Sequence, residues 1–233
     1  MIARVGLAAD PAIAIPDDAR IGAHVVLEAG VVLGAGVTIQ HHAVIGKQPA
    51  LAARSRTRPA YDGEADARTL LADGCTVGCG AVLVAGVSVG PRAIVGDHTF
   101  LREGATLGAD VVLGHGGAVG PRVEIGARTR IQNSVMLGPG SVVEDDVFVG
   151  PGVIVTNDPT LGRREAGRSL TGATLRRGCR VGAAVVLMPG VEIGAEAVVA
   201  AGSLVTRDVA PGMLVMGIPA RVVRTASAAP GPA

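Results

Sequence analysis

The chain has 233 residues, a net charge of +1 at pH 7 and a pI near 7.8. It contains 35 glycines, while aromatic residues make up 1% and tryptophan is absent. A core built on aromatic rings is therefore excluded, and the 48% of hydrophobic residues must form a regular, narrow core of Val, Ile, Leu and Ala. The balanced charge, with no aromatics between basic residues, argues against a nucleic-acid or membrane-surface partner.

The sequence holds no segment that is expected to enter a membrane. The first residues, MIARVGLAADPAIAIPDD, hold no long apolar run, so we expect no signal peptide. The longest uncharged run, Gly74 to Pro91, is broken by glycines and is not expected to span a bilayer. Cys75, Cys79 and Cys179 form neither a disulfide framework nor a zinc motif, so we expect small buried side chains in a reducing cytoplasm, without a metal.

Aliphatic residues recur at every sixth position in three blocks, which run from Ile15 to Leu51, from Leu71 to Val155 and from Leu175 to Val205. A period of six matches neither a helix nor a plain strand. It does match a short strand followed by a corner, with one inward side chain per face. Three faces close a coil of 18 residues, and coils stacked about 4.8 Å apart satisfy each other's backbone groups.

The pattern resembles the hexapeptide-repeat family, whose fold is a left-handed parallel β-helix. The resemblance implies an all-β protein with about nine coils, whose thin interior has no room for rings. We expect this domain over residues 1–207 and a C-terminal extension with a short helix over 208–224. Residues 225–233, rich in Ala, Pro, Gly and Ser, are expected to be a disordered tail.

Two stretches interrupt the repeat, at residues 52–70 and 162–174. Each combines arginines with acidic residues, and each must leave the prism at a corner. Long loops on a rigid scaffold often carry function, but a plain surface excursion fits the same sequence.

The C-terminal block reads VGAAVVLMPGVEIGAEAVVAAGSLVTRDVAPGMLVMGIPARVVR. It resembles the acyl-CoA-binding end of hexapeptide acyltransferases. The resemblance implies that acetyl-CoA is the co-substrate and that its pantetheine arm lies in a groove between two subunits of a homotrimer. Small residues would line the groove at Ala183, Ala201 and Gly202. The adenine and phosphates would lie near Arg207, Pro219 and Arg221.

A second segment, IQNSVMLGPGSVVEDDVFVGPGVIVTNDPTLGRR, is similar to the acyltransferases that N-acetylate nucleotide-linked 3-amino sugars. The shared order is I-Q-N, then E-D-D-V-F-x-G-P, then T-N-D and a later Arg. This resemblance implies that Asn133, Asn157 and Asp158 line the substrate pocket. Further candidates for binding the substrate and its phosphates are the basic residues Lys47, Arg163 and Arg164.

Spacing gives an independent argument for a catalytic column. Asp97, His115 and Asn133 are 18 residues apart in turn, and each follows an inward aliphatic residue by two positions. They are therefore expected to stack about 4.8 Å apart. An aspartate can fix the tautomer of a neighbouring histidine, which could accept a proton from an attacking amine, while Asn133 holds the reacting group. A solvated or trimer-packing corner is the other interpretation of the same column.

The remaining histidines give weaker signals. His24 and His42 are also 18 residues apart and are expected to stack at a corner, whereas His98 follows Asp97 and is expected to point to a different side of the corner. The γ-class carbonic anhydrases share this fold, but the close His-x4-His pair of their metal site is absent from this sequence.

The sequence therefore predicts a cytoplasmic, homotrimeric, acyl-CoA-dependent N-acyltransferase that moves an acetyl group to a nucleotide-linked amino sugar. Three alternatives stay open. The first is acyl transfer to a hydroxyl or to another small amine, the second is an acyl-carrier-protein donor, and the third is a hexapeptide scaffold without activity.

Overall fold

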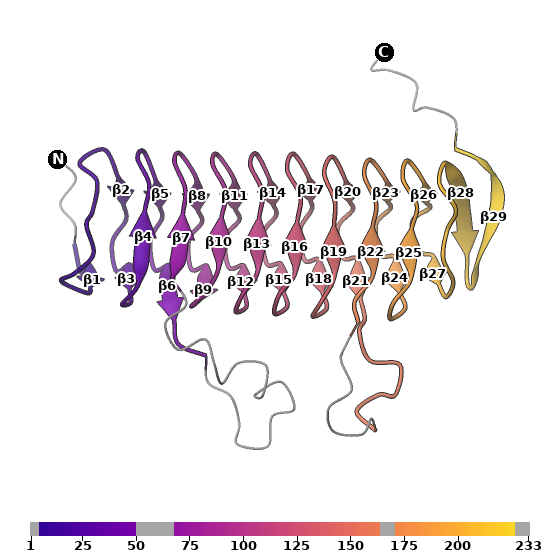
Figure 1. Cartoon of the computed structure of the whole chain (residues 1–233), viewed down its shortest axis with the longest axis horizontal. Helices are drawn as coiled ribbons and strands as arrows, with labels where there is room; N and C mark the ends of the chain where they lie inside the picture. Colours follow the sequence, from indigo (N-terminus) through magenta and orange to yellow (C-terminus); the bar gives the residue numbers. More distant parts are fainter. Residues whose placement is uncertain (1–4, 50–67, 164–170, 227–233) are drawn as a thin grey trace, which may run out of the picture.

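The structure, a computed structural model, describes residues 5–49, 68–163 and 171–226, and every element in these ranges is a strand. The chain winds through three parallel sheets in turn, and so forms a long prism with the N-terminal coils at one end and the C-terminal strands at the other (Figure 1). This parallel β-solenoid confirms the predicted all-β fold and is consistent with a left-handed β-helix.

We name the three sheets A, B and C. Sheet A consists of β1 (Ala8–Ala9), β3 (Val26–Leu27), β6 (Val44–Lys47), β9 (Val82–Val84), β12 (Phe100–Leu101), β15 (Ala118–Val119), β18 (Met136–Leu137), β21 (Ile154–Val155), β24 (Val186–Leu187) and β27 (Leu204–Val205). Sheet C consists of β4 (Val31–Leu33), β7 (Thr69–Leu71), β10 (Ser88–Val89), β13 (Thr106–Leu107), β16 (Glu124–Ile125), β19 (Val142–Val143), β22 (Thr174–Leu175) and β25 (Glu192–Ile193). Sheet B consists of β2 (Arg20–Ile21), β5 (Thr38–Ile39), β8 (Thr76–Val77), β11 (Ile94–Val95), β14 (Val112–Leu113), β17 (Arg130–Ile131), β20 (Phe148–Val149), β23 (Arg180–Val181), β26 (Val198–Val199), β28 (Met213–Gly217) and β29 (Ala220–Thr225).

The hexad residues form the interior, as predicted. In the described ranges every sixth residue is buried, from Ile21 at the N-terminal end to Val205, and Ile15 is half-buried. Each coil donates backbone hydrogen bonds to the next, as in the bond of 2.7 Å from Gly96 N to the Leu113 carbonyl. Sheet A has ten strands, because β1 adds a coil before the first aliphatic hexad, with Ala9 at the inward position.

Since the chain passes from sheet A to C, then to B and back to A, the prism has an A–C corner, a C–B corner and a B–A corner. Both predicted insertions open after a sheet A strand, β6 or β21, and close before a sheet C strand, β7 or β22. They therefore leave the prism at the same A–C corner. The interiors of these loops, residues 50–67 and 164–170, and the predicted tail from residue 227 onward lie outside the described residues.

The expected C-terminal helix is wrong. Residues 213–225 instead form an antiparallel pair, in which β28 continues sheet B beside β26 and β29 pairs with β28. The edge of β26 would otherwise be unpaired, and a valine-rich segment is better suited to extending a sheet than to a helix. The turn between the two strands runs through Gly217, whose φ of 102° favours glycine.

The three outer faces differ in chemistry. In each of the ten strands of sheet A the outward side chain next to the inward residue is apolar, and Phe100, Met136 and Ile154 are each about 40% exposed. The exposed Lys47 at the end of β6 is the exception among the described strands of this sheet. Sheet B places Arg20, Arg130 and other polar residues among apolar ones, whereas the middle of sheet C presents polar residues such as Thr106. The apolar outward residues of sheet A are Ala8, Val26, Val44, Val82, Phe100, Ala118, Met136, Ile154, Val186 and Leu204.

Alternating charges form a ladder along the C–B corner. Arg92, Asp110, Arg128 and Asp146 follow one another at 18-residue steps, each with φ near +60°. The Arg92 guanidinium donates to both Asp110 oxygens at 2.7 and 2.6 Å, and Arg128 donates to both Asp146 oxygens at 2.7 and 2.8 Å. These paired hydrogen bonds lower the pKa of Asp110 and of Asp146.

We predict that replacing Asp110 and Asp146 together by Asn lowers the melting temperature at pH 7. A carboxylate whose pKa is lowered on folding stabilises the fold above its unfolded pKa and loses that effect as pH falls through its folded pKa. The difference from wild type should therefore shrink between about pH 5 and pH 2, and also with added salt. Thermal melts across pH check this, with Asp17→Asn as the control. An unchanged difference at acidic pH would contradict the prediction.

Candidate functional site

The predicted catalytic residues share one column on the B–A corner. Strands β11, β14 and β17 pair in register, with Val95 opposite Leu113 and Leu113 opposite Ile131. Asp97, His115 and Asn133 each lie two positions beyond these inward residues, and all three are exposed. The spacing argument for this column is therefore consistent with the register of the strands.

Asp97 is engaged differently from the expected pairing with His115. Its Oδ1 accepts a hydrogen bond of 2.8 Å from the backbone N–H of Cys79, one coil toward the N-terminus. No hydrogen bond between the side chains of Asp97 and His115 is found in the described part of the chain. Asp73, Asp145 and His41 cap backbone N–H groups in the same way, because the corner leaves these donors without a backbone partner.

The ring of His98 lies against that of His115. The centroids are 5.7 Å apart and the planes are nearly perpendicular, at 89°. His98 therefore contacts the column through His115, a contact that the spacing argument did not include. His98 adopts the left-handed conformation, with φ of 54°, and its ring also covers Gly80 in the preceding coil. By contrast, the expected stacking of His24 on His42 is confirmed, with centroids 5.1 Å apart and an interplanar angle of 12°.

Asn133 has a defined orientation. Its Oδ1 accepts a hydrogen bond of 3.1 Å from the backbone N–H of His115. Because the carbonyl oxygen of the amide is used in this way, the NH₂ group of Asn133 is the part that can donate to a bound molecule. The column thus presents an imidazole and an amide donor on neighbouring coils.

The residues predicted to line the acetyl-CoA groove continue this column. Strands β17, β20, β23 and β26 pair in register, so that Asn133 is followed by Pro151, Ala183 and Ala201. Gly202 is next to Ala201, and a Cβ added to Gly202 would meet nothing within 4 Å. In the N-terminal half, the equivalent Gly80 is covered by the ring of His98. The corner is therefore bare where a thin ligand arm is expected.

Asn157 and Asp158 lie on the A–C corner, directly after β21. Asp158 Oδ1 accepts hydrogen bonds from the Thr160 N–H at 2.8 Å and the Thr160 hydroxyl at 2.7 Å, and its other oxygen accepts from Gly162 N–H at 2.9 Å. Asp158 therefore shapes the turn that opens the second insertion. The side chain of Asn157 packs near Gly138 of the preceding coil and is half-buried.

The basic candidates are divided between different places. Lys47 is at the end of β6 on the A–C corner, and Arg163 is exposed at the start of the second insertion, while Arg164 is outside the described residues. Arg207 follows β27 on the same A–C corner. Arg221 lies in β29, where its Nη1 donates to the Ala220 carbonyl at 2.9 Å.

One chain does not bring all these residues together. The B–A corner, where the sheet A strands begin, holds His115, Asn133, Ala183 and Ala201. The A–C corner, where these strands end, holds Asn157 and Arg207. These two corners are called the two edges of sheet A below. The sequence argument missed this separation, although it can be read from the hexad count: residues on different corners are offset by six or twelve positions, not by eighteen.

The cysteines have ordinary structural surroundings. Burial raises the pKa of Cys75 and of Cys179 to about 12, so both thiols stay protonated in the interior. Cys79 is half-exposed, and its thiol donates to Gln40 Oε1 at 3.3 Å.

Within the described ranges, no three His, Cys, Asp or Glu side chains converge as metal ligands. The same ranges contain no helix long and apolar enough to cross a membrane.

Comparison with known families supports the repeat. Residues 13–47 match the family model described as bacterial transferase hexapeptide (six repeats), and residues 177–207 match the hexapeptide repeat of succinyl-transferase. Over 44 residues the chain is 48% identical to the galactoside O-acetyltransferase of Escherichia coli, a match that covers 19% of this chain and 22% of that enzyme. Over 47 residues it is 49% identical to the 2,3,4,5-tetrahydropyridine-2,6-dicarboxylate N-acetyltransferase of Staphylococcus aureus, covering 20% of each.

The chain thus matches about a fifth of the length of these curated relatives. A hexapeptide-repeat acetyltransferase of Vibrio cholerae, solved with acetyl coenzyme A, is 31% identical, with 52% of this chain and 73% of that chain covered and a TM-score of 0.40. LpxA of Acinetobacter baumannii shares the fold at 16% identity and a TM-score of 0.54, covering 94% of this chain and 72% of that one. The chain thus shares its hexapeptide repeat with bacterial transferases over residues 13–47 and 177–207.

Proposed function

We propose that the protein is an acetyl-CoA-dependent N-acetyltransferase whose acyl acceptor is a nucleotide-linked amino sugar. The observation that carries this proposal is the continuous B–A column, in which His115 and Asn133 are followed by the bare positions Ala183 and Ala201. The base His115 and the amide donor Asn133 thereby lie at one end of a row of small residues on the B–A corner. Such a row suits the narrow pantetheine arm that carries the thioester. The names of the relatives support acetyl transfer, since they include both an N- and an O-acetyltransferase.

The reaction needs no covalent enzyme intermediate. The substrate amine attacks the thioester carbonyl, and the imidazole of His115 accepts the proton that the amine loses. The Asn133 NH₂ group, oriented by the hydrogen bond between its oxygen and the His115 backbone, donates to the oxyanion that forms. Collapse of this intermediate expels the thiolate of CoA, which takes up a proton. The contact between His98 and His115 helps to hold the base in position.

Acceptor binding is assigned to the other edge of sheet A. Asn157, Lys47 and Arg163 lie there, and together with Asp158 and Arg164 they are the proposed substrate-binding residues. The three-part resemblance around Asn133 and Asn157 supports an amino sugar as the substrate. Acetyl-CoA would be held by Ala183, Ala201 and Gly202 from one chain, with Arg207, Pro219 and Arg221 near its phosphates.

Because the two halves of the site lie on opposite edges of sheet A, we propose a homotrimer in which each site is shared by two chains. The row of apolar side chains along the outer face of sheet A supports this assembly, since contiguous exposed apolar patches mark interfaces. A location in the cytoplasm is proposed on the three free cysteines and the need for acetyl-CoA.

A kinetic test separates the roles of the column. We predict that His115→Ala lowers kcat by about 10²–10⁴-fold and that Asn133→Ala lowers it by about 10²-fold or more, each with little change in the KM for acetyl-CoA. Thiol release from acetyl-CoA, measured with a panel of nucleotide-linked amino sugars, sugars without the amine and simple amines, gives both constants. His42→Ala, another corner histidine, is the control. Full activity in His115→Ala would remove it as the base, and no thiol release with any acceptor would overturn the enzymatic proposal.

The assembly is tested on the apolar face. We predict that Met136→Glu combined with Ile154→Glu converts the trimer to monomers, because two charges would be buried against a neighbouring chain. Sedimentation equilibrium gives the mass of each species. Thr106→Glu, an outward position on sheet C, is expected to leave the trimer intact. A trimer that survives both sheet A substitutions would exclude this face as the interface.

A further inference from the structure

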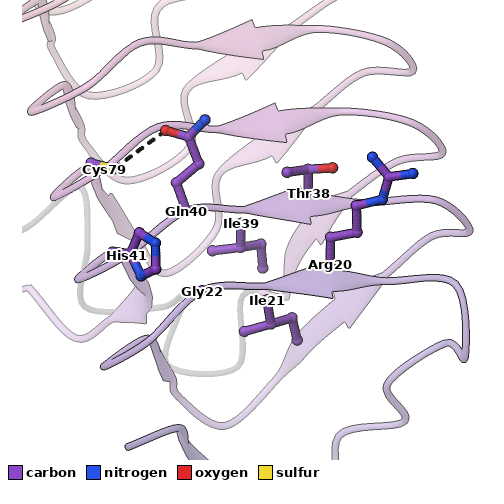
Figure 2. Close-up of a pocket in the computed structure, with 8 residues that line it drawn as sticks. All are labelled: Arg20, Ile21, Gly22, Thr38, Ile39, Gln40, His41 and Cys79. Atoms are coloured by element: carbon purple, nitrogen blue, oxygen red, sulfur yellow. Dashed lines mark hydrogen bonds between the residues drawn. The ribbon is translucent and has the colours of Figure 1, made fainter. Parts of the chain in front are cut away.

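A groove opens on the outer surface of sheet B, at the N-terminal end of the B–A column that also holds His115. It has a volume of about 440 Å³ and is lined by the first two strands of the sheet, β2 and β5, and by the B–A corner that follows them. Figure 2 shows two groups of polar side chains in it: Arg20 and Thr38 on one side, and Gln40, His41 and Cys79 on the other. The groove is independent of the proposed acetyl transfer.

Internal hydrogen bonds occupy the acceptor atoms on the corner side. The Cys79 thiol donates to Gln40 Oε1 at 3.3 Å, as the dashed line in Figure 2 marks. The backbone N–H of Ala23 donates to Nδ1 of His41 at 2.8 Å. What remains for a ligand is the NH₂ group of Gln40 and, in the neutral tautomer that this bond requires, the Nε2–H of His41. Both are donors.

The strand side adds a cation. Arg20 is exposed, and in the described part of the chain no carboxylate pairs with it. Its guanidinium presents N–H donors next to the hydroxyl of Thr38. None of the eight described residues that line the groove is acidic. The groove therefore offers donors and positive charge, without an anion of its own.

The two groups are separated along the sheet. Thr38 begins β5 and Gln40 directly follows this strand, so the two residues lie two positions apart in extended chain, which corresponds to about 7 Å. A single small anion cannot contact both groups well, whereas a ligand with two linked anionic centres can. We propose that this groove binds a diphosphate group, with Arg20 and Thr38 holding one phosphate and Gln40 and His41 holding the other.

The groove lies at the N-terminal end of the same B–A column, because His41 and Cys79 hold the positions that Asp97 and His115 hold farther along the prism. Along sheet B, β5 is followed by β8, β11 and β14, so His41 lies three coils from His115, or about 14 Å. It is farther still from Ala183 and Ala201, where CoA is placed. The diphosphate can come from two sources, free pyrophosphate or a nucleoside diphosphate, and the chemistry of the groove is the same for both.

The experiment uses Cys79 as a reporter of the groove. Cys75 and Cys179 are buried, so a neutral maleimide should label Cys79 selectively in the folded full-length protein. Binding of inorganic phosphate, inorganic pyrophosphate and UDP is measured by equilibrium dialysis, and the labelling rate is followed with and without each. We expect pyrophosphate and UDP to bind and to slow the labelling of Cys79, and inorganic phosphate to bind at least about tenfold more weakly than pyrophosphate.

Two variants test the donors. Arg20→Gln removes the cation, and Gln40→Glu keeps the acceptor for the Cys79 thiol but places a carboxylate in the groove. Each is expected to weaken pyrophosphate binding by about tenfold or more. Arg130→Gln is the matched control, because Arg130 lies at the same outward position of sheet B outside the groove.

The outcomes are clear-cut. Tighter binding of UDP than of pyrophosphate assigns the site to a nucleoside diphosphate, and equal binding assigns it to the diphosphate alone. The proposal would be overturned if neither pyrophosphate nor UDP bound, or if their binding left the labelling rate of Cys79 unchanged. It would also be overturned if inorganic phosphate bound as tightly as pyrophosphate, or if Arg130→Gln weakened pyrophosphate binding as much as Arg20→Gln. UDP that binds at the proposed acceptor site on the A–C corner is distinguished from UDP in the groove, because only binding in the groove slows the labelling of Cys79 and is weakened by Arg20→Gln.

Discussion

Each coil must return to the same three corners after 18 residues, because its strands find backbone partners only in the coils on either side. The inward aliphatic residue at every sixth position enforces this return. A shift of one residue would place a polar or glycine position in a core that is only one side chain deep. Every functional feature of the surface follows, since the constraint sorts residues into straight columns. The His115 column, the Arg–Asp ladder and the His24–His42 stack are three results of the same rule.

The same rule explains what the sequence predicts well. Residues 18 apart stack whatever their side chains are, so the fold, the core and the His24–His42 contact are accessible from spacing alone. Contacts between neighbouring columns cannot be predicted from spacing alone. The ring of His98 contacts that of His115, and Asp97 turns to the Cys79 N–H because a corner donor needs a partner. The C-terminal strands β28 and β29 were also missed, since their conformation depends on the free edge of β26 and not on local periodicity.

The prism also limits what a single chain can do. The candidate residues for acetyl-CoA and for the acceptor lie on two different corners of one chain. The proposed site residues occupy both edges of sheet A, and a row of apolar side chains on its outer face lies between them. Packing of chains around a threefold axis would hide that face and bring opposite edges of neighbouring chains together. In this account assembly and catalysis depend on the same surface.

The most direct measurement is complementation between two inactive variants, His115→Ala and Asn157→Ala, co-expressed or refolded together. If each site takes His115 from one chain and Asn157 from its neighbour, random trimers regain intact sites, and about a quarter of the wild-type activity should return. If both residues act within one chain, no mixed trimer contains an intact site. Activity that stays at the level of the separate variants, in trimers shown to be mixed, would contradict a site shared between chains.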